Sequence, residues 1–185
     1  MFTRLPLLAC AIVLAMVPIS SGQGKDSCPM ASLPSGAQAV LGRQYGEWRP
    51  KRVSDLGADD KKIWAETHPK DCPGIAIGHF EKPDQLAYAV LLVPKSQSSH
   101  GYRIVVLSKV ATGDSYAATV LDQGDAQDAD SGMVISTAPR GSYSDFEGTA
   151  SVQVKLDAVN VEWIEKAAVL YYWAHGKYQT LQTED

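Results

Sequence analysis

The sequence has few cysteine and histidine residues, and it lacks the short motifs of several common enzyme classes. Only three cysteines and four histidines occur among its 185 residues. The Gly-x-Ser-x-Gly motif of α/β-hydrolases, the phosphate-binding Gly-x4-Gly-Lys-Ser/Thr loop and the zinc motif His-Glu-x-x-His are all absent. We therefore predict no cofactor and no metal site, and we favour a protein without catalytic activity. A hydrolase with another motif stays open, because catalytic groups need not be close in sequence.

Positive charge is also scarce. The chain has 17 lysine and arginine residues against 21 aspartate and glutamate residues, which gives a formal net charge of -4. Removal of Arg4 with a cleaved leader lowers this charge to -5. A nucleic-acid-binding protein is expected to carry a basic patch. The acidic balance therefore argues against nucleic acid and in favour of a basic partner.

The longest apolar run at the N-terminus predicts a secretory signal peptide over residues 1–22. Arg4 supplies a short positive region, residues 5–19 are apolar, and Ser20 and Gly22 are small residues at a plausible cleavage site. A membrane span would need about 20 apolar residues. Cys10 ends a segment that resembles a lipoprotein cleavage box, so lipidation stays open as an alternative. We expect a periplasmic or secreted mature protein that forms one domain over residues 23–185, with no membrane span.

Two cysteines, Cys28 and Cys72, remain after such a cleavage. In an oxidising compartment, two cysteines have a single possible pairing. The loop that such a bond would close is long enough for a stabilisation of roughly 4 kcal/mol in the chain-entropy model. We predict a structural disulfide between these residues, with a reactive or metal-binding thiol as the alternative.

Residues 35–67 predict two helices. Ser35 is a candidate cap for a helix over 37–45, in which Ala37, Val40 and Leu41 share one face. The residue before Pro50 disfavours the helical region, so we expect the first helix to end by that point. The second helix is predicted over 58–67, with its acidic residues near the positive N-terminal end.

From Cys72 onward the pattern changes to β-strands separated by polar turns. Strands are predicted at 75–80, 86–93, 103–110, 116–121, 134–137, 152–156, 159–164, 168–173 and 178–182. Residues 86–93 are apolar at nearly every position, which indicates a central strand covered on both faces. Residues 138–148 are predicted to be mostly irregular. The predicted fold is α+β, with two N-terminal helices packed on a curved antiparallel β-sheet.

One segment resembles a known family. Gly78-His79-Phe80, followed by Asp84 and by Leu86-Ala87-Tyr88-Ala89-Val90, is similar to a degenerate FG-GAP-type strand–loop–strand unit. In that family an acidic loop binds calcium, but here His79 stands in place of the first acid. With Cys72-Pro73-Gly74 and the terminal segment 168–185, this unit resembles uncharacterised secreted or periplasmic bacterial proteins. The resemblance implies a location but no activity.

Two clusters of polar or aromatic residues are candidate sites. His79 leaves a predicted strand beside Glu81 and Asp84, which could form acid–base machinery, although we favour a hydrogen-bond network at the strand end. Trp163 and Tyr171-Tyr172-Trp173 could form a platform for stacking sugars. Because side chains alternate along a strand, Tyr171 and Trp173 are expected on one face and Tyr172 on the other, with a core role favoured for at least one face.

The strongest candidate binding site is an acidic loop predicted over residues 122–132. It contains four aspartates within nine residues and no basic residue, namely Asp122, Asp125, Asp128 and Asp130. Their mutual repulsion is expected to hold the loop out in solvent. A solvated loop without function, a weak cation site and a contact surface for a basic partner are all open interpretations, although the spacing does not match an EF-hand.

These observations favour an extracytoplasmic non-catalytic protein that binds another protein, of the inhibitor or immunity type. The acidic residues would then speed association with a basic protein. The alternatives are an envelope module that binds a small ligand, a glycan or a cation, and a hydrolase whose motif is not recognisable. The oligomeric state is left open by the sequence.

Overall fold

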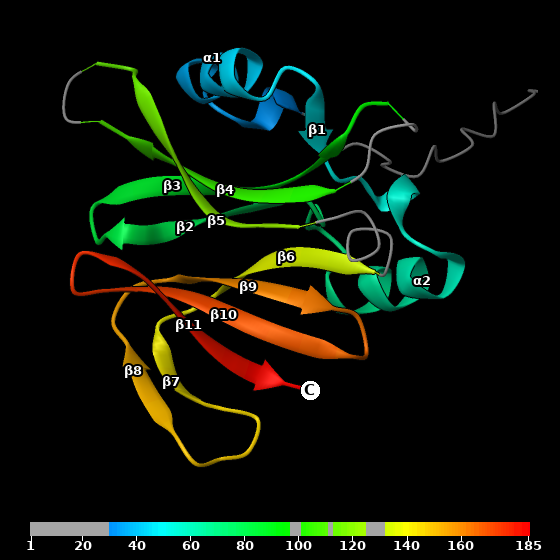
Figure 1. Ribbon diagram of the computed structural model, residues 1–185, viewed down its shortest axis with the longest axis vertical. Coiled ribbons are helices and arrows are strands. Elements are labelled where there is room, and N and C mark those ends of the chain that lie inside the picture. Colours follow the sequence, from blue (N-terminus) through cyan, green and yellow to red (C-terminus); the bar gives the residue numbers. More distant parts are fainter. Residues whose placement is uncertain (1–29, 97–100, 111–112, 125–131) are drawn as a thin grey trace, which may run out of the picture.

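Two stacked antiparallel β-sheets dominate the computed structural model, which describes residues 30–96, 101–110, 113–124 and 132–185 (Figure 1). The first sheet contains β1 (Trp48–Pro50), β2 (Ile75–Lys82), β3 (Gln85–Pro94), β4 (Tyr102–Lys109) and β5 (Tyr116–Gly124). The second sheet has the order β11 (Lys177–Glu184), β10 (Ala167–Ala174), β9 (Ala158–Trp163) and β6 (Met133–Ala138). A separate hairpin is formed by β7 (Gly141–Ser144) and β8 (Ser151–Val154).

The main core lies between the two sheets. Alternate residues of each strand point into it, as the two-residue period of a strand requires. Its buried members include Phe80, Leu91 and Ile104 from the first sheet and Ile135 and Val161 from the second. Fully burying one such side chain contributes about 1.5–3 kcal/mol relative to leaving it exposed. The contacts between the sheets are therefore a major stabilising part of the fold.

The prediction that residues 86–93 are covered on both faces is confirmed for residues 89–93, whereas Leu86 at the start of the strand is exposed. Within β3, Leu91 faces the core between the sheets, whereas Val90 and Leu92 point to the opposite face. That face is covered by α1 (Ser35–Gln44), whose buried residues are Ala37, Val40 and Leu41. The three helical residues are those that the sequence placed on one face.

The second helix, α2 (Ala58–Thr67), lies elsewhere. Trp64 of α2 and the nearby Leu56 pack against Val134 and Ile164, at one end of the second sheet. The predicted α+β fold, with both helices on one curved sheet, is therefore wrong. The described part of the chain is mostly β, and the two short helices pack on different sheets (Figure 1). Periodicity shows which residues of a strand share a face, but not which other segment covers that face.

Ser35 does not cap α1. The N-cap position belongs to Pro34, and no side chain caps the helix there. Ser35 is the first helical residue, and its hydroxyl donates a hydrogen bond of 2.9 Å to Asp114 Oδ2 beyond the end of β4. Its side chain therefore joins the helix to the first sheet, which a local reading of the sequence cannot show.

The strands β1 and β2 pair one after the other with the same edge of β3. Trp48 is opposite Pro94 in β1, and Ile75 is opposite Val90 in β2. Between them, the Lys51 N–H donates to the Leu91 carbonyl (2.9 Å), and the Leu91 N–H donates to the Gly74 carbonyl (3.0 Å). The chain thus leaves the sheet after Lys51, forms α2, and returns at Gly74. β1 was not predicted from the sequence, because a strand of three residues that includes a proline is too short to show alternation.

Candidate functional site

The β7–β8 hairpin projects from the second sheet and carries the candidate site at its turn (Figure 1). One side of the hairpin packs on that sheet, where Tyr143, Val152 and Val154 contact a cluster of buried residues. This cluster comprises Ala138, Ala158 and Leu170, with the partly buried Tyr172 and Leu181 against it. In addition, the Tyr143 hydroxyl donates a 2.6 Å hydrogen bond to the Pro139 carbonyl at the base of the hairpin. The hairpin is thus fixed to the body of the protein.

Asp145 organises the turn that joins the two strands. Its N–H donates to the Ala150 carbonyl (2.9 Å), and its own carbonyl accepts from the Gly148 N–H (3.0 Å). Its carboxylate accepts from the Ala150 N–H (3.0 Å) and from the Thr149 hydroxyl (2.7 Å). Gly148 has φ +69°, a conformation that glycine adopts at no steric cost.

The same hydrogen bonds affect the charge of Asp145. Donation from the Ala150 N–H, and then from the Thr149 hydroxyl, lowers the pKa of this carboxyl. Hydrogen bonding to the charged form of an acid favours that form. The carboxylate therefore supports the turn at every pH above the ordinary range of an aspartate. This support is lost only as the pH falls through the lowered pKa.

Phe146 follows Asp145 at the tip of the turn. Its relative exposure of 48% is the highest of any large hydrophobic side chain in the described residues. Its backbone is nevertheless held, because the Phe146 N–H donates a 3.1 Å hydrogen bond to the Gln182 carbonyl of β11. The turn therefore presents an apolar ring to solvent from a backbone bonded both within the turn and to the sheet.

Of the four predicted loop aspartates, only Asp122 lies within the described residues. It belongs to β5, opposite Ile104, rather than to a loop. Its Oδ2 accepts hydrogen bonds from the Tyr102 hydroxyl (3.0 Å) and from the Tyr171 hydroxyl (3.2 Å) of the second sheet. Its side chain thus joins the two sheets. Asp125, Asp128 and Asp130 are outside the described ranges, so their predicted role stays a prediction.

Two tyrosines of the second sheet, the buried Tyr171 and the partly buried Tyr178, have raised pKa values. Burial, reinforced by the Asp122 carboxylate, raises the pKa of Tyr171. Burial also raises the pKa of Tyr178, whose hydroxyl donates a 3.1 Å hydrogen bond to Glu81 Oε1. Trp173 packs edge-on against Tyr178, with ring centroids 5.0 Å apart. Tyr171 faces the main core and Tyr172 packs on the other face, as predicted. Trp173 lies opposite Tyr178, which also packs on the main core, so it shares the face of Tyr171.

These pKa values lead to a prediction about alkaline pH. A phenol with a raised pKa contributes stability that is complete below its ordinary pKa of about 10 and is lost as the pH rises through the raised value. Of the eight tyrosines in the chain, Tyr171 and Tyr178 should stay protonated until the protein unfolds. Absorbance at alkaline pH should show this late ionisation, and Tyr171→Phe and Tyr178→Phe should each reduce it. Full ionisation of all tyrosines in the folded protein would contradict the prediction.

His79 pairs with a residue that is distant in sequence. Its N–H donates to Asp157 Oδ2 (2.8 Å), and its Nδ1 lies 3.4 Å from the same oxygen. Glu81 instead accepts a hydrogen bond from the Tyr178 hydroxyl, and Asp84 is exposed at the β2–β3 turn. The three residues that the sequence grouped as possible acid–base machinery thus have separate environments. The FG-GAP-like segment forms the β2–β3 hairpin, and its relation to a family stays a prediction.

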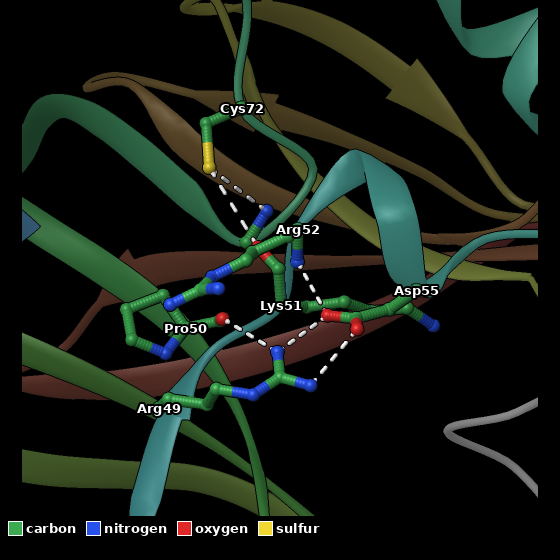
Figure 2. A network of polar contacts seen from close by, with 7 residues as sticks. Arg49, Pro50, Lys51, Arg52, Asp55 and Cys72 are labelled. Carbon is green, nitrogen blue, oxygen red and sulfur yellow. Dashed lines mark hydrogen bonds and ion pairs between the residues drawn. The ribbon is translucent and has the colours of Figure 1, made fainter. Parts of the chain in front are cut away.

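The junction between β1 and β2 contains a further polar network (Figure 2). Arg49 forms a two-pronged ion pair with Asp55, whose Oδ2 also accepts from the Arg52 N–H (2.8 Å). Burial would raise the pKa of Asp55, but the bonds from Arg49 and Arg52 outweigh it and lower that pKa. The ion pair links β1 to the residues that follow Lys51, where the chain leaves the sheet.

Cys72 lies at the return point of the same segment. Its Sγ is 3.4 Å from the Gly74 nitrogen and 3.8 Å from the Lys51 carbonyl oxygen (Figure 2). The predicted partner, Cys28, lies outside the described residues, as does the predicted signal peptide over residues 1–22. The disulfide and the cleavage therefore stay predictions.

Comparison with known proteins gives no relative: no family model, no curated protein and no solved structure matches the chain. Within the described residues, no helix is long and apolar enough to cross a membrane. The same residues contain no cluster of three or more histidine, cysteine, aspartate or glutamate side chains arranged to hold a metal ion.

The turn at Asp145 and Phe146 was not predicted from the sequence. Residues 138–148 were expected to be mostly irregular, whereas β7 occupies Gly141–Ser144. One local signal was present, because an aspartate three residues before a glycine is typical of a β-turn. The anchoring of the Phe146 backbone had no such signal, because its hydrogen-bond partner Gln182 lies in the distant β11.

Proposed function

We propose that this is an extracytoplasmic, non-catalytic protein that binds another protein, of the inhibitor or immunity type. The observation that carries the proposal is the exposed Phe146 on the internally hydrogen-bonded turn at Asp145. Binding energy in protein interfaces is concentrated in a few residues, often aromatic, that fill a pocket on the partner. A turn that already has its bound shape also loses less conformational entropy on binding.

The polar groups elsewhere support a binding role over catalysis. Asp122, Glu81 and Asp157 each accept a hydrogen bond that joins separate parts of the fold, and Asp55 is bonded to the nearby Arg49 and Arg52. The glycan-binding alternative is weakened, because Tyr171, one of the aromatic residues expected to stack on a sugar, is buried in the main core. The acidic net charge and the predicted signal peptide suit a protein that meets a basic partner outside the cytoplasm.

The proposal is tested by capture with matched variants. Immobilised protein would be exposed to the envelope fraction of the organism that produces it, in parallel with Phe146→Ala and Val120→Ala. Val120 is the control, because it is 45% exposed but lies on β5 in the other sheet. We expect a protein that wild type and Val120→Ala retain, and that Phe146→Ala binds roughly tenfold or more weakly, as for a hot-spot residue.

The identity and activity of the retained protein complete the test. Under the inhibitor interpretation it is an enzyme or toxin whose activity falls when the wild-type protein is added, and falls less with Phe146→Ala. Equal retention by all three proteins, or no retention by the wild type, contradicts the proposal. Conversion of a substrate by the purified protein alone would support the hydrolase alternative.

A further inference from the structure

The C-terminal end of β11 lies beside the Phe146 turn. Gln182 makes the connection, because its carbonyl accepts from the Phe146 N–H at 3.1 Å. Its side-chain amide donates to the Glu184 carbonyl and to Asp185 Oδ1, both at 3.4 Å. Glu184 and Asp185 are thus held next to the turn, and Glu147 follows Phe146 within it. The backbone of Phe146 is therefore bonded to the strand end that carries Glu184 and Asp185, and Glu147 is its neighbour within the turn.

No ion pair within the described part of the chain neutralises these acidic residues. Among the residues that the structure describes, the ion pairs are Arg49–Asp55 and His79–Asp157, and neither involves Glu147, Glu184 or Asp185. All three are exposed. The neighbouring Glu162 has a raised pKa because of burial and then because of the Glu184 charge, which is consistent with a negative field here.

We propose that Phe146 and the carboxylates of Glu147, Glu184 and Asp185 form one docking surface for a cationic protein, whose apolar pocket is rimmed by lysine and arginine. This inference rests on the proposed function and specifies the partner. The pocket receives the ring, and the rim meets the carboxylates. Complementary charge of this kind speeds association and excludes partners of the wrong sign.

Charge also decides between the possible occupants of this surface. A second copy of the chain would bring like charges together across the same acidic patch. Nucleic acid and anionic lipid would be repelled for the same reason. A basic protein is the class of macromolecule that gains from both the exposed ring and its acidic surroundings.

The test uses defined peptides, so that it does not depend on finding the native partner. The first probe is decalysine. The second is a lysine decapeptide with a central cluster of leucines, which offers an aliphatic surface to the Phe146 ring. Decaglutamate is the control. Binding is followed by the NMR shifts of the Phe146, Glu147, Glu184 and Asp185 amides. We expect both lysine peptides to shift these amides, the leucine-containing peptide more strongly, and decaglutamate to leave them unchanged.

Two charge variants with an equal loss of negative charge sharpen the test. Glu147→Gln/Glu184→Gln/Asp185→Asn removes the carboxylates near Phe146, whereas Glu47→Gln/Asp59→Asn/Asp84→Asn removes three exposed acids elsewhere. The first variant should weaken binding of the lysine peptides roughly tenfold at low salt and lessen its salt dependence, since exposed charges are screened at high ionic strength. The second should change binding less than twofold.

Equal effects of the two variants, or lysine-induced shifts that centre elsewhere on the surface, would overturn the docking surface. Failure of this peptide test with successful Phe146-dependent capture would leave the proposed function intact and refute the cationic partner. Binding of the lysine peptides at this surface without any capture from the envelope would support the docking surface and contradict the proposed function. The two proposals therefore fail separately.

Discussion

Gly74→Ala should strongly destabilise the protein. A Cβ atom at this position would lie 2.3 Å from the Lys51 carbonyl oxygen and 2.6 Å from the Lys51 nitrogen. Both are backbone atoms at the junction of β1 and β2, and the Lys51 N–H is bonded to Leu91 of β3. The clash therefore cannot be relieved by rotation of a side chain. We expect the free energy of unfolding to fall by about 3 kcal/mol, at the upper end of the usual cost of overpacking.

The control is Gly42→Ala. Gly42 lies in α1, and a Cβ there would have no neighbour within 4 Å. Because alanine is the better helix former, this change should raise the free energy of unfolding by about 0.5–1 kcal/mol. Denaturant unfolding of both variants would measure the two effects. Equal midpoints for Gly74→Ala and wild type would show that β1 and β2 do not meet as described.

Asp122→Ala should have the second largest effect on stability. It removes the shared acceptor of the Tyr102 and Tyr171 hydroxyls, which lie between the two sheets. A buried donor that loses its acceptor costs about 1–3 kcal/mol. We therefore expect a loss of about 2–3 kcal/mol for Asp122→Ala, against about 1 kcal/mol for Tyr171→Phe, which leaves no polar hydrogen behind.

A double-mutant cycle separates this pair from a general effect. Asp122→Ala should cost less in the Tyr171→Phe background than in wild type, with a coupling of roughly 0.5 kcal/mol or more for groups in contact. The control Asp84→Ala, at an exposed turn, should change stability by no more than about 0.5 kcal/mol. Additive effects of Asp122→Ala and Tyr171→Phe would show that the hydrogen bond between them contributes nothing.

The stability of Asp122→Ala also bears on the acidic loop. The sequence placed Asp122 with Asp125, Asp128 and Asp130 as one solvent-exposed group. The structure instead pairs Asp122 with two tyrosines inside the fold. A charge change at Asp122 would therefore confound binding with folding. Tests of a steering role for the loop should be restricted to the other three aspartates.

The positions of most regular elements were determined by the sequence itself. The helix over 58–67 is α2 as predicted, and the β-rich runs from residue 75 onward correspond to strands in the described part of the chain. Local rules suffice here, because the two-residue and 3.6-residue periods of apolar side chains depend only on neighbouring residues. The alternation of Tyr171 and Tyr172 was predictable for the same reason.

The arrangement of these elements was decided only by the tertiary structure. β1 pairs with β3 through backbone groups, and Asp122, His79 and Phe146 each take their principal partners from segments far away in sequence. Hydrogen bonds of this kind leave no periodic pattern, since either partner could bond to many other groups. The acidic character that favours a basic partner was visible in the composition. The position of the exposed Phe146 was not visible there, because its backbone is bonded to Gln182 of the distant β11.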